Sequence, residues 1–227
     1  FIAVYGEKKA EEMFKAFHSK STISIRTNLT RCTPDELRAM LEAEGVTVTA
    51  VDELNYAFVI SEFDYLNGLQ SFRDGLFYVQ DISSMLVAQT AAPKKGDYVI
   101  DVCAAPGGKS THIAELLQGS GHVLARDLTD NKVDMIEENI ERHGLNNMSA
   151  EVWDATVPDA DSAGKADILI CDLPCSGLGV LGRKKDIRYK MTPESVDELA
   201  ALQRQILDTV HTYVKPNGVL VYSTCTI

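Results

Sequence analysis

The fold of this chain is decided by the stretch Tyr98-Val99-Ile100-Asp101-Val102-Cys103-Ala104-Ala105-Pro106-Gly107-Gly108-Lys109. Its apolar run ends in Asp101, passes through small residues to a pair of glycines, and leads into a helix that we expect from Ser110 to Leu117. A buried parallel strand, a tight turn and a helix N-terminus together give this pattern. Glycines let a backbone approach a ligand, and a helix N-terminus offers free N–H groups to a carboxylate or phosphate. The stretch therefore predicts a ligand site at the carboxyl end of the strand.

The turn alone has a second interpretation, an ordinary strand-to-helix turn of a doubly wound domain. It lacks the four residues that separate Gly from Gly-Lys-Ser/Thr in a P-loop. It also lacks the three-glycine spacing that lets a pyrophosphate settle on a helix, which argues against a nicotinamide cofactor. Later motifs decide between the two interpretations.

Strands and helices alternate along the chain from Asp97 onward. Repeated units of this kind predict a mostly parallel sheet with helices on both faces, the Rossmann-like α/β architecture. We place this domain at residues 76–227 and expect it to be truncated at its C-terminus. The expected strands are 97–102, 121–126, 149–153, 166–171 and 218–223, and the expected helices are 108–118, 130–143 and 193–213.

A small α+β domain is predicted for residues 21–75, and we interpret it as an RRM-like RNA-binding domain. The stretch Thr33-Pro34-Asp35-Glu36 is a capping box with proline at the first helical position, so a helix begins there. Residues 1–20 predict a linking helix whose apolar side chains form one stripe. The expected elements of the small domain are strands at 23–27, 46–51 and 56–60 and a helix at 34–44, and the stripe consists of Ala10, Met13, Phe14 and Phe17.

Acidic side chains follow three consecutive strands of the predicted parallel sheet. Asp101, Asp127 and Asp154 each lie at or just past a strand end. The carboxyl ends of parallel strands line one crevice, and Asp127 has the spacing at which an acid contacts ribose hydroxyls. A lone acid at such a place is more often a helix cap or turn former. Three acids in register behind a Gly-Gly turn favour a site for a nucleoside cofactor.

Two cysteine motifs follow later strands, at Asp172-Leu173-Pro174-Cys175-Ser176-Gly177 and at Tyr222-Ser223-Thr224-Cys225. Their thiols are expected at carboxyl ends of strands, where ligands bind in this architecture. We expect Cys171 and Cys32 to be buried small hydrophobes. For Cys103 we expect a packing role and a backbone contact with the cofactor.

The Gly-Gly turn and the two cysteine motifs together resemble the RNA cytosine-5 methyltransferases of the Nop2/Sun class, most closely the bacterial Sun-type enzymes that act on small-subunit ribosomal RNA. The resemblance begins at about Gly75 and covers most of the chain from there. It implies an S-adenosylmethionine-dependent enzyme that forms 5-methylcytosine in 16S ribosomal RNA. The same chemistry on transfer RNA is an alternative. Another is a non-catalytic RNA-binding or ribosome-assembly factor on the same fold.

The resemblance also implies roles for the motif residues. Cys225 is the nucleophile, Cys175 assists product release, and Asp172 is the partner of cytosine N3. Covalent addition of a thiolate to C6 makes C5 nucleophilic, which splits one hard step into easier ones. The turn binds the methionine end of the cofactor, Asp127 the ribose, and Asp154 lies near the adenine. The implied cofactor-binding residues are Asp101, Cys103, Ala104, Ala105, Pro106, Gly107, Gly108, Lys109, Asp127, Asp154 and Asp172.

One residue departs from the pattern of the resembled enzymes. Arg126 stands where they more often carry an apolar residue, so the setting of the neighbouring Asp127 is open.

RNA contacts are predicted in the basic segment 182–190, because it follows a catalytic motif and its tyrosine can stack on a base. A solvated loop is the alternative for such a charge run. In the small domain, Arg26, Arg31 and Arg38 are either phosphate contacts or solvated surface arginines. The residues expected to contact RNA are Arg183, Lys184, Lys185, Arg188 and Tyr189.

Composition limits the remaining possibilities. The 227 residues carry a formal net charge of -11, which argues against gripping nucleic acid with the whole surface and favours a local basic patch. No apolar run is long enough to span a bilayer, and no secretory pattern is present. The five cysteines show no disulfide or zinc spacing, so we expect a cytoplasmic monomer without a metal. Because the first residue is Phe1, we expect a piece of a longer protein.

Overall fold

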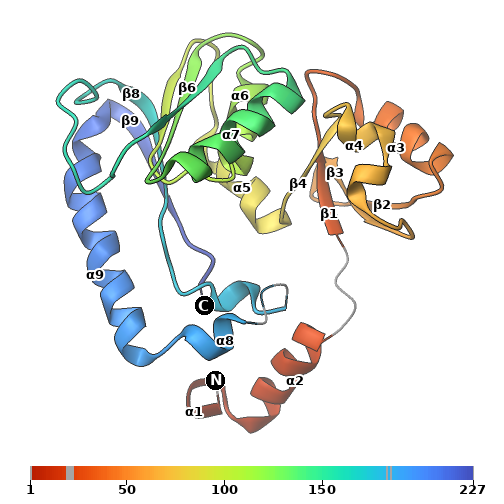
Figure 1. The fold of residues 1–227 in the computed structure, drawn as a ribbon, viewed down its shortest axis with the longest axis horizontal. Helices are drawn as coiled ribbons and strands as arrows, with labels where there is room; N and C mark the ends of the chain where they lie inside the picture. Colours follow the sequence, from red (N-terminus) through yellow and green to blue (C-terminus); the bar gives the residue numbers. More distant parts are fainter. Residues whose placement is uncertain (1, 19–22, 183, 185, 227) are drawn as a thin grey trace.

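A computed structural model describes residues 2–18, 23–182, 184 and 186–226, and it contains two sheets that lie side by side (Figure 1). The larger sheet has five parallel strands in the order β7-β6-β5-β8-β9. This confirms the predicted Rossmann-like α/β class. The strands are β5 (Tyr98–Asp101), β6 (His122–Asp127), β7 (Met148–Val152), β8 (Ala166–Asp172) and β9 (Val214–Ser223).

Helices cover both faces of the larger sheet because its strands are apolar on both sides. Val99 packs into one core with α5, α6 and α7, whereas the next residue, Ile100, packs into a second core with α9. Successive side chains of a strand point to opposite faces, so a continuous apolar run fills both cores. The helices are α5 (Ile82–Ala91), α6 (Gly108–Leu116), α7 (Asp130–His143) and α9 (Pro193–Val210).

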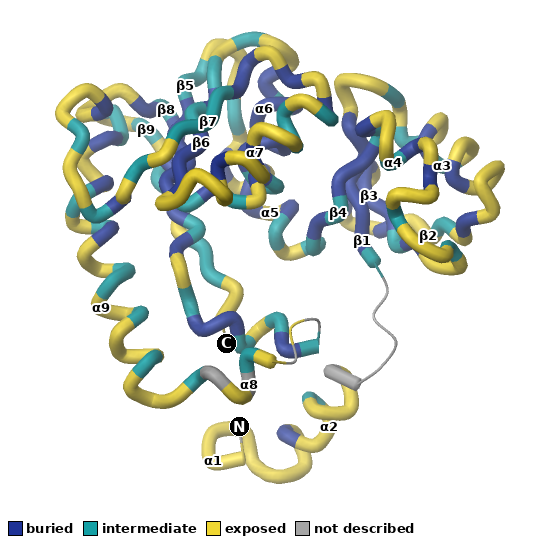
Figure 2. Tube along the Cα trace, in the orientation of Figure 1, coloured by how far each residue is buried: buried dark blue, intermediate teal, exposed yellow. Residues whose placement is uncertain are grey.

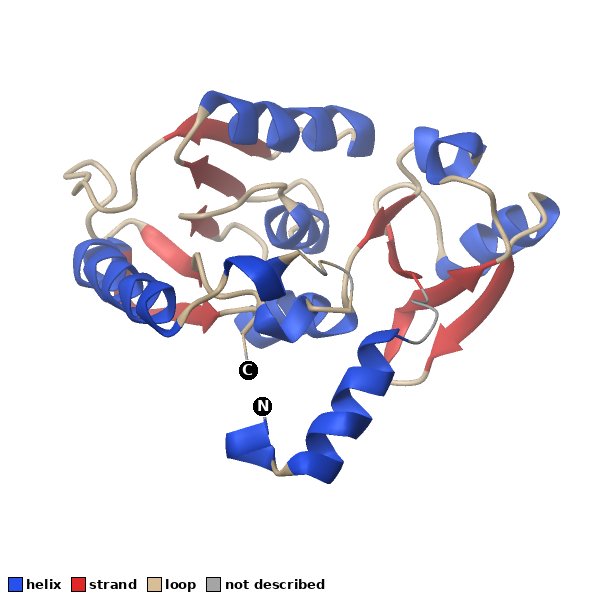
Figure 3. Cartoon of the chain, turned by 60° about the horizontal axis from the view of Figure 1, so that its bottom comes forward, coloured by secondary structure: helices blue, strands red, loops and turns tan. Residues whose placement is uncertain are grey.

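The smaller sheet has four antiparallel strands in the order β2-β3-β1-β4 (Figure 3). With two helices, its chain order is βαββαβ, the ferredoxin-like arrangement. The predicted capping box is present, since Thr33 and Glu36 exchange side-chain and backbone hydrogen bonds. The elements are β1 (Ile23–Thr27), α3 (Pro34–Ala43), β2 (Thr47–Val51), β3 (Leu54–Ser61), η1 (Leu66–Gly68), α4 (Gln70–Arg73) and β4 (Phe77–Val79). Strand β4 lies past residue 75, where the sequence placed the end of this domain.

The two faces of the smaller sheet have different neighbours. Ile25 and Phe58 pack with Leu37 and Leu41 of α3 in one core. Ala57 and its neighbours on the other face pack with Met85 of α5. The face that lacks α3 is therefore covered by the larger domain.

Of the three arginines singled out in the small domain, Arg31 is exposed and Arg38 is partly buried, whereas Arg26 is buried, so both alternatives for Arg26 are wrong. Arg26 is 0% exposed, because the second face of its sheet meets α6 and not solvent. Arg31 donates to the backbone oxygens of His143 (2.9 Å) and Asp74 (2.8 Å). The guanidinium of Arg38 lies 5.2 Å from the centre of the Phe58 ring.

The N-terminal segment forms two helices, α1 (Ile2–Tyr5) and α2 (Glu7–His18), rather than the one helix predicted over 1–20. Gly6, with a φ of +77°, separates them. Most of their described residues are exposed, and Ala10 is buried (Figure 2). Three short elements complete the fold, η2 (Leu178–Val180), α8 (Ile187–Lys190) and η3 (His211–Tyr213). No helix among the described residues is long and apolar enough to cross a membrane.

Candidate functional site

Asp101 and Gly107 shape the turn that follows β5, one by its hydrogen bonds and the other by its backbone conformation. Asp101 is 1% exposed and accepts hydrogen bonds from Ser110 Oγ (2.5 Å) and the Cys103 N–H (3.4 Å). Burial raises the pKa of Asp101 to about 7. Gly107 has a φ of +100°, a left-handed conformation that favours glycine, and it caps α6. Asp101 thus lies beneath the turn and holds its shape.

A cavity of about 270 Å³ opens at the carboxyl ends of the strands of the larger sheet. Residues that follow β5, β6, β7, β8 and β9 line it, together with two apolar side chains of α9. The lining residues are Val102, Cys103, Ala105, Asp127, Leu128, Lys132, Trp153, Asp154, Ala155, Thr156, Asp172, Leu173, Pro174, Cys175, Leu202, Ile206 and Cys225. The structure therefore brings together both cysteine motifs, two of the three predicted acids and part of the turn.

Asp127 connects the turn to the next helix. Its Oδ2 accepts from the Ala105 N–H (2.9 Å), and its Oδ1 accepts from the Leu128 N–H (2.7 Å) and from Lys132 Nζ (2.8 Å). The sequence interpretation missed Lys132, although its place in the first turns of the helix after Asp127 was a usable signal. The Lys132 side chain is 50% exposed, so it can move aside when a ligand needs the carboxylate.

Arg126 does not disturb Asp127, because neighbouring residues of a strand point to opposite faces. Its guanidinium bonds to Glu151 (2.6 Å), Asp159 (2.6 Å) and Ser162 (3.0 Å). The departure from the resembled pattern is therefore compensated within its own polar cluster.

Asp154 lines the cavity and also shapes its own loop. Its Oδ1 accepts from the N–H (2.8 Å) and the hydroxyl (2.7 Å) of Thr156, and these bonds lower the pKa of Asp154. Trp153, the only tryptophan of the chain, lies beside it in the cavity lining and was missed. Its position directly after a strand was the signal for it.

Asp172 forms an ion pair with Lys109 of the turn. Lys109 Nζ lies 2.5 Å from Asp172 Oδ2, and Ser223 Oγ donates to Oδ1 at 2.7 Å. The two side chains are 16% and 30% exposed. The contacts join α6, β8 and β9 at one point beside the cavity.

The two motif thiols meet at this point. Cys175 Sγ and Cys225 Sγ are 3.2 Å apart, and the Cys225 N–H lies 3.2 Å from Cys175 Sγ. Partial burial of its sulfur, the hydrogen bond with Cys175 and the charge of Asp172 raise the pKa of Cys225 to about 11. Cys225 is exposed, whereas Cys171 is buried as predicted, Cys32 is half-buried rather than fully buried, and burial raises the pKa of the half-buried Cys103.

The predicted RNA-contact segment is described in part. Lys184 is exposed and Tyr189 is 77% exposed. Arg183, Lys185 and the Arg188 side chain lie outside the described residues. The segment adjoins the first cysteine motif, since a Cβ on Gly177 would lie 2.8 Å from a methyl carbon of Ile187 in α8.

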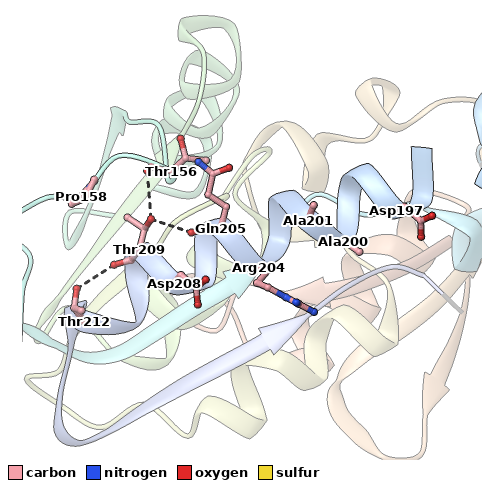
Figure 4. Close-up of a pocket in the computed structure, with 10 residues that line it drawn as sticks. All are labelled: Thr156, Pro158, Asp197, Ala200, Ala201, Arg204, Gln205, Asp208, Thr209 and Thr212. Carbon is pink, nitrogen blue, oxygen red and sulfur yellow. Dashed lines mark hydrogen bonds between the residues drawn. The ribbon is translucent and has the colours of Figure 1, made fainter. Parts of the chain in front are cut away.

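A second, larger groove of about 790 Å³ runs along the outer side of α9 (Figure 4). Seven of its ten lining residues are polar or charged, and none is a cysteine or a part of the turn. It meets the smaller cavity at Thr156, which lines both. We assign the chemistry to the smaller cavity, because the thiols, Asp127 and Asp172 lie there. The groove residues are Thr156, Pro158, Asp197, Ala200, Ala201, Arg204, Gln205, Asp208, Thr209 and Thr212.

Comparison with known proteins identifies the family. The family described as 16S rRNA methyltransferase RsmB/F matches residues 88–227, and the ferredoxin-like domain described as Methyltr_RsmF/B-like matches residues 1–64. The probable ribosomal RNA small subunit methyltransferase B of Bacillus subtilis (strain 168) is 38% identical over 224 residues, which are 98% of this chain and 50% of that protein. The chain thus spans about half the length of that curated relative.

Solved structures agree with this relationship. The crystal structure of PH0851 has a TM-score of 0.94 at 29% identity and covers 100% of this chain and 51% of its own. A methyltransferase homolog protein from Pyrococcus horikoshii has a TM-score of 0.82 at 27% identity, with coverage of 100% and 71%. The resemblance seen in the sequence and the Rossmann-like fold are confirmed. This chain belongs to the RsmB/F family of 16S rRNA methyltransferases.

Proposed function

We propose that this protein methylates C5 of a cytosine in 16S ribosomal RNA through a covalent bond between Cys225 and C6. The observation that carries the proposal is the meeting of two thiols, 3.2 Å apart, beside Asp172 and the turn that opens α6. Members of the family are named as 16S rRNA methyltransferases, which supports the RNA substrate.

The cavity residues fit S-adenosylmethionine. Asp127 offers carboxylate oxygens to ribose hydroxyls once Lys132 moves aside, and Asp154, which lines the same cavity, offers an acceptor to the amino group of an adenine. Apolar side chains such as Leu128 and Ile206 suit the faces of the base. The first N–H groups of α6 lack intrahelical partners and suit the methionine carboxylate. When bound, the cofactor supplies an electrophilic methyl group on a sulfonium.

The reaction begins with addition of the Cys225 thiolate to C6 of the cytosine. The carboxylate of Asp172 favours the N3-protonated base, which accepts the electron pair that the thiolate pushes into the ring. The addition makes C5 nucleophilic, so C5 would take the methyl group that bound S-adenosylmethionine would supply, with the thioether of S-adenosylhomocysteine as the leaving group. Lys109 keeps the Asp172 carboxylate in place through the step.

Release reverses the addition. A base takes the C5 proton, the C–H electron pair re-forms the C5–C6 double bond, the bond from C6 to Cys225 Sγ breaks with its electrons on sulfur, and N3 gives up its added proton to solvent. Cys175 Sγ, next to that sulfur, can hydrogen-bond the departing thiolate. We assign to Lys184 and Tyr189, with Arg183, Lys185 and Arg188, the contacts to the RNA around the flipped base.

The test uses the full-length protein, S-adenosylmethionine and unmodified small-subunit ribosomal RNA. Methyl transfer and protein–RNA adducts that survive denaturing gels are measured for Cys225→Ala, Cys175→Ala and the control Cys32→Ala. We expect Cys225→Ala to abolish both, Cys175→Ala to accumulate adduct, and Cys32→Ala to act like the unmutated protein.

Other outcomes separate the alternatives. Adduct with Cys225→Ala and none with Cys175→Ala would assign the nucleophile to Cys175 of the first cysteine motif. Transfer to tRNA but not to ribosomal RNA would change the substrate. A protein that binds RNA but neither binds the cofactor nor transfers methyl groups would be an assembly factor.

A further inference from the structure

The smaller sheet packs against the helix that the cofactor turn opens. Arg26 of β1 is among the largest fully buried side chains of the described residues. Its Nε donates to Gln80 Oε1 (2.9 Å), its Nη2 donates to Thr111 Oγ1 (3.1 Å), and its Nη1 pairs with Glu115. Two of these partners belong to α6, so a strand of the small domain is bonded through one arginine to a helix of the larger domain.

Two more side chains at the end of the smaller sheet reach the turn itself. Tyr78 of β4 donates its hydroxyl to the Pro106 carbonyl oxygen (3.3 Å). Gln80, whose N–H still pairs with Ser24 of β1, donates Nε2 to the Gly108 carbonyl oxygen (3.2 Å). The turn is thus held by hydrogen bonds from outside its own domain.

These bonds fix the direction of the N–H groups of the turn. The C=O and N–H of a trans peptide share a plane and point in opposite directions. A carbonyl of Gly108 held toward the smaller sheet therefore turns the Lys109 N–H away from that sheet. The Thr111 hydroxyl, which Arg26 holds, donates to the same carbonyl oxygen at 3.2 Å.

The ring of Tyr78 also fills the space beside Gly108. A Cβ on Gly108 would lie 3.1 Å from Tyr78 Cε1, tighter than ordinary contact. The tyrosine ring therefore occupies the space that a side chain at position 108 would need.

We propose that Arg26, Tyr78 and Gln80 are positioning residues that preset the turn for the methionine end of the cofactor, so that the small domain is a working part of the cofactor site. The proposal rests on the proposed function, which assigns that end of the cofactor to the turn. It also assigns a role to the sheet face that RRM domains use to stack bases, since that face here meets the larger domain.

The test compares two ligands by isothermal titration calorimetry on the full-length protein. S-adenosylmethionine has the methionine end, and 5′-methylthioadenosine lacks it. The variants are Tyr78→Phe, Gln80→Glu and the pair together. Glutamate at position 80 still accepts from Arg26 but cannot donate to the Gly108 carbonyl, so the buried arginine keeps its partner.

Each lost hydrogen bond to the turn is expected to raise the Kd of S-adenosylmethionine about fivefold, and the pair about twentyfold. The Kd of 5′-methylthioadenosine should change by less than about twofold, because it lacks the methionine end that the preset N–H groups of the turn are proposed to bind. The control is Asn28→Ala. Asn28 is 0% exposed, donates within the small domain to Gly75 O (2.9 Å) and donates across the same interface to His143 O (3.2 Å), away from the turn. It should lower the Tm and leave both Kd values unchanged.

Three results would overturn the inference. Unchanged Kd values in all variants would show that the bonds do not position the turn. Equal losses for both ligands, or the same loss in Asn28→Ala, would mean a general structural effect. Failure of the unmutated protein to bind S-adenosylmethionine would overturn the proposed function as well.

Discussion

The interface between the two sheets and the cavity at the strand ends each contain an ion pair, which is buried at the interface and partly exposed at the cavity. At the interface, Arg26 pairs with Glu115, and their side chains are 0% and 2% exposed. At the cavity, Lys109 and Asp172 pair at 16% and 30% exposure, next to the exposed Cys225. A charged side chain that is buried must keep its partner, because water cannot replace it. A charged side chain that water reaches can exchange its partner for a ligand. The difference separates side chains that fix the structure from side chains that carry the chemistry.

The largest expected effect comes from breaking the buried pair. Glu115→Ala leaves the Arg26 charge buried without its carboxylate, and we expect a loss of about 3–5 kcal/mol in the free energy of unfolding. Lys109→Ala breaks the partly exposed pair and should cost about 1 kcal/mol or less. Urea unfolding followed by circular dichroism measures both. Similar losses in the two variants would remove the distinction between the regions.

A smaller effect is expected where the backbones of the two domains meet. Gly75 has a φ of +66°, and a Cβ there would lie 1.9 Å from the Arg142 carbonyl oxygen. Gly75→Ala adds left-handed strain to a clash, which we expect to cost about 2–4 kcal/mol. Gly164, with a φ of +64° and open space around it, is the matched control. Gly164→Ala should show only the strain, about 1–2 kcal/mol, in the same unfolding assay. Equal costs would mean that the interface yields at this point.

Asp101 is as buried as the ion pair at the interface, but its hydrogen bonds come from neutral groups, Ser110 Oγ and the Cys103 N–H. Burial raises its pKa to about 7 in the folded protein, against about 4 in an unfolded chain. Between these values the folded state holds the proton more tightly. Its contribution to stability is therefore complete below about pH 4 and is lost as the pH rises through about 7.

Asp101→Asn removes this titration. From about pH 5 to about pH 7 the unmutated protein should lose about 2–3 kcal/mol of unfolding free energy relative to the variant. Parallel urea curves at the two pH values measure the difference. A constant difference between the two proteins would show that Asp101 does not titrate in this window.

The larger sheet and most of the cavity motifs were predictable, because the hydrophobic period of a strand or helix and the residues that end it are local features of the sequence. The run Tyr98 to Asp101 reads as a buried strand, and acids or cysteine motifs mark the strand ends. Strand β4 was missed because its three residues are too short to show a period. Leu202 and Ile206 were missed because the placement of α9 across the sheet leaves no signal in its own sequence.

Arg26 shows what local reasoning cannot supply. The strand at 23–27 was predicted correctly, but both alternatives for Arg26 placed its side chain on the surface. Its carboxylate partner, Glu115, lies 89 residues away in the chain. The role of the small domain in RNA binding stays a prediction, and Lys184 with Tyr189 are the described residues that carry the RNA proposal.

The smallest expected effect concerns the partly exposed cavity, at the pair of thiols. Cys175→Ala removes a neighbour at 3.2 Å and should change the reactivity of Cys225 without a large change in stability. Burial is the main cause of the raised pKa of Cys225, and Cys175 is the second, so the variant lowers that pKa only in part. At about pH 8 a lower pKa means more thiolate, partly offset by its weaker nucleophilicity, and alkylation by iodoacetamide should be about twofold faster. Peptide mapping by mass spectrometry follows Cys225, with the half-buried Cys32 as the internal reference. Slower alkylation of Cys225 in the variant would mean that Cys175 activates the thiol, and the assignment of the two sulfurs to separate steps would then have to be revised.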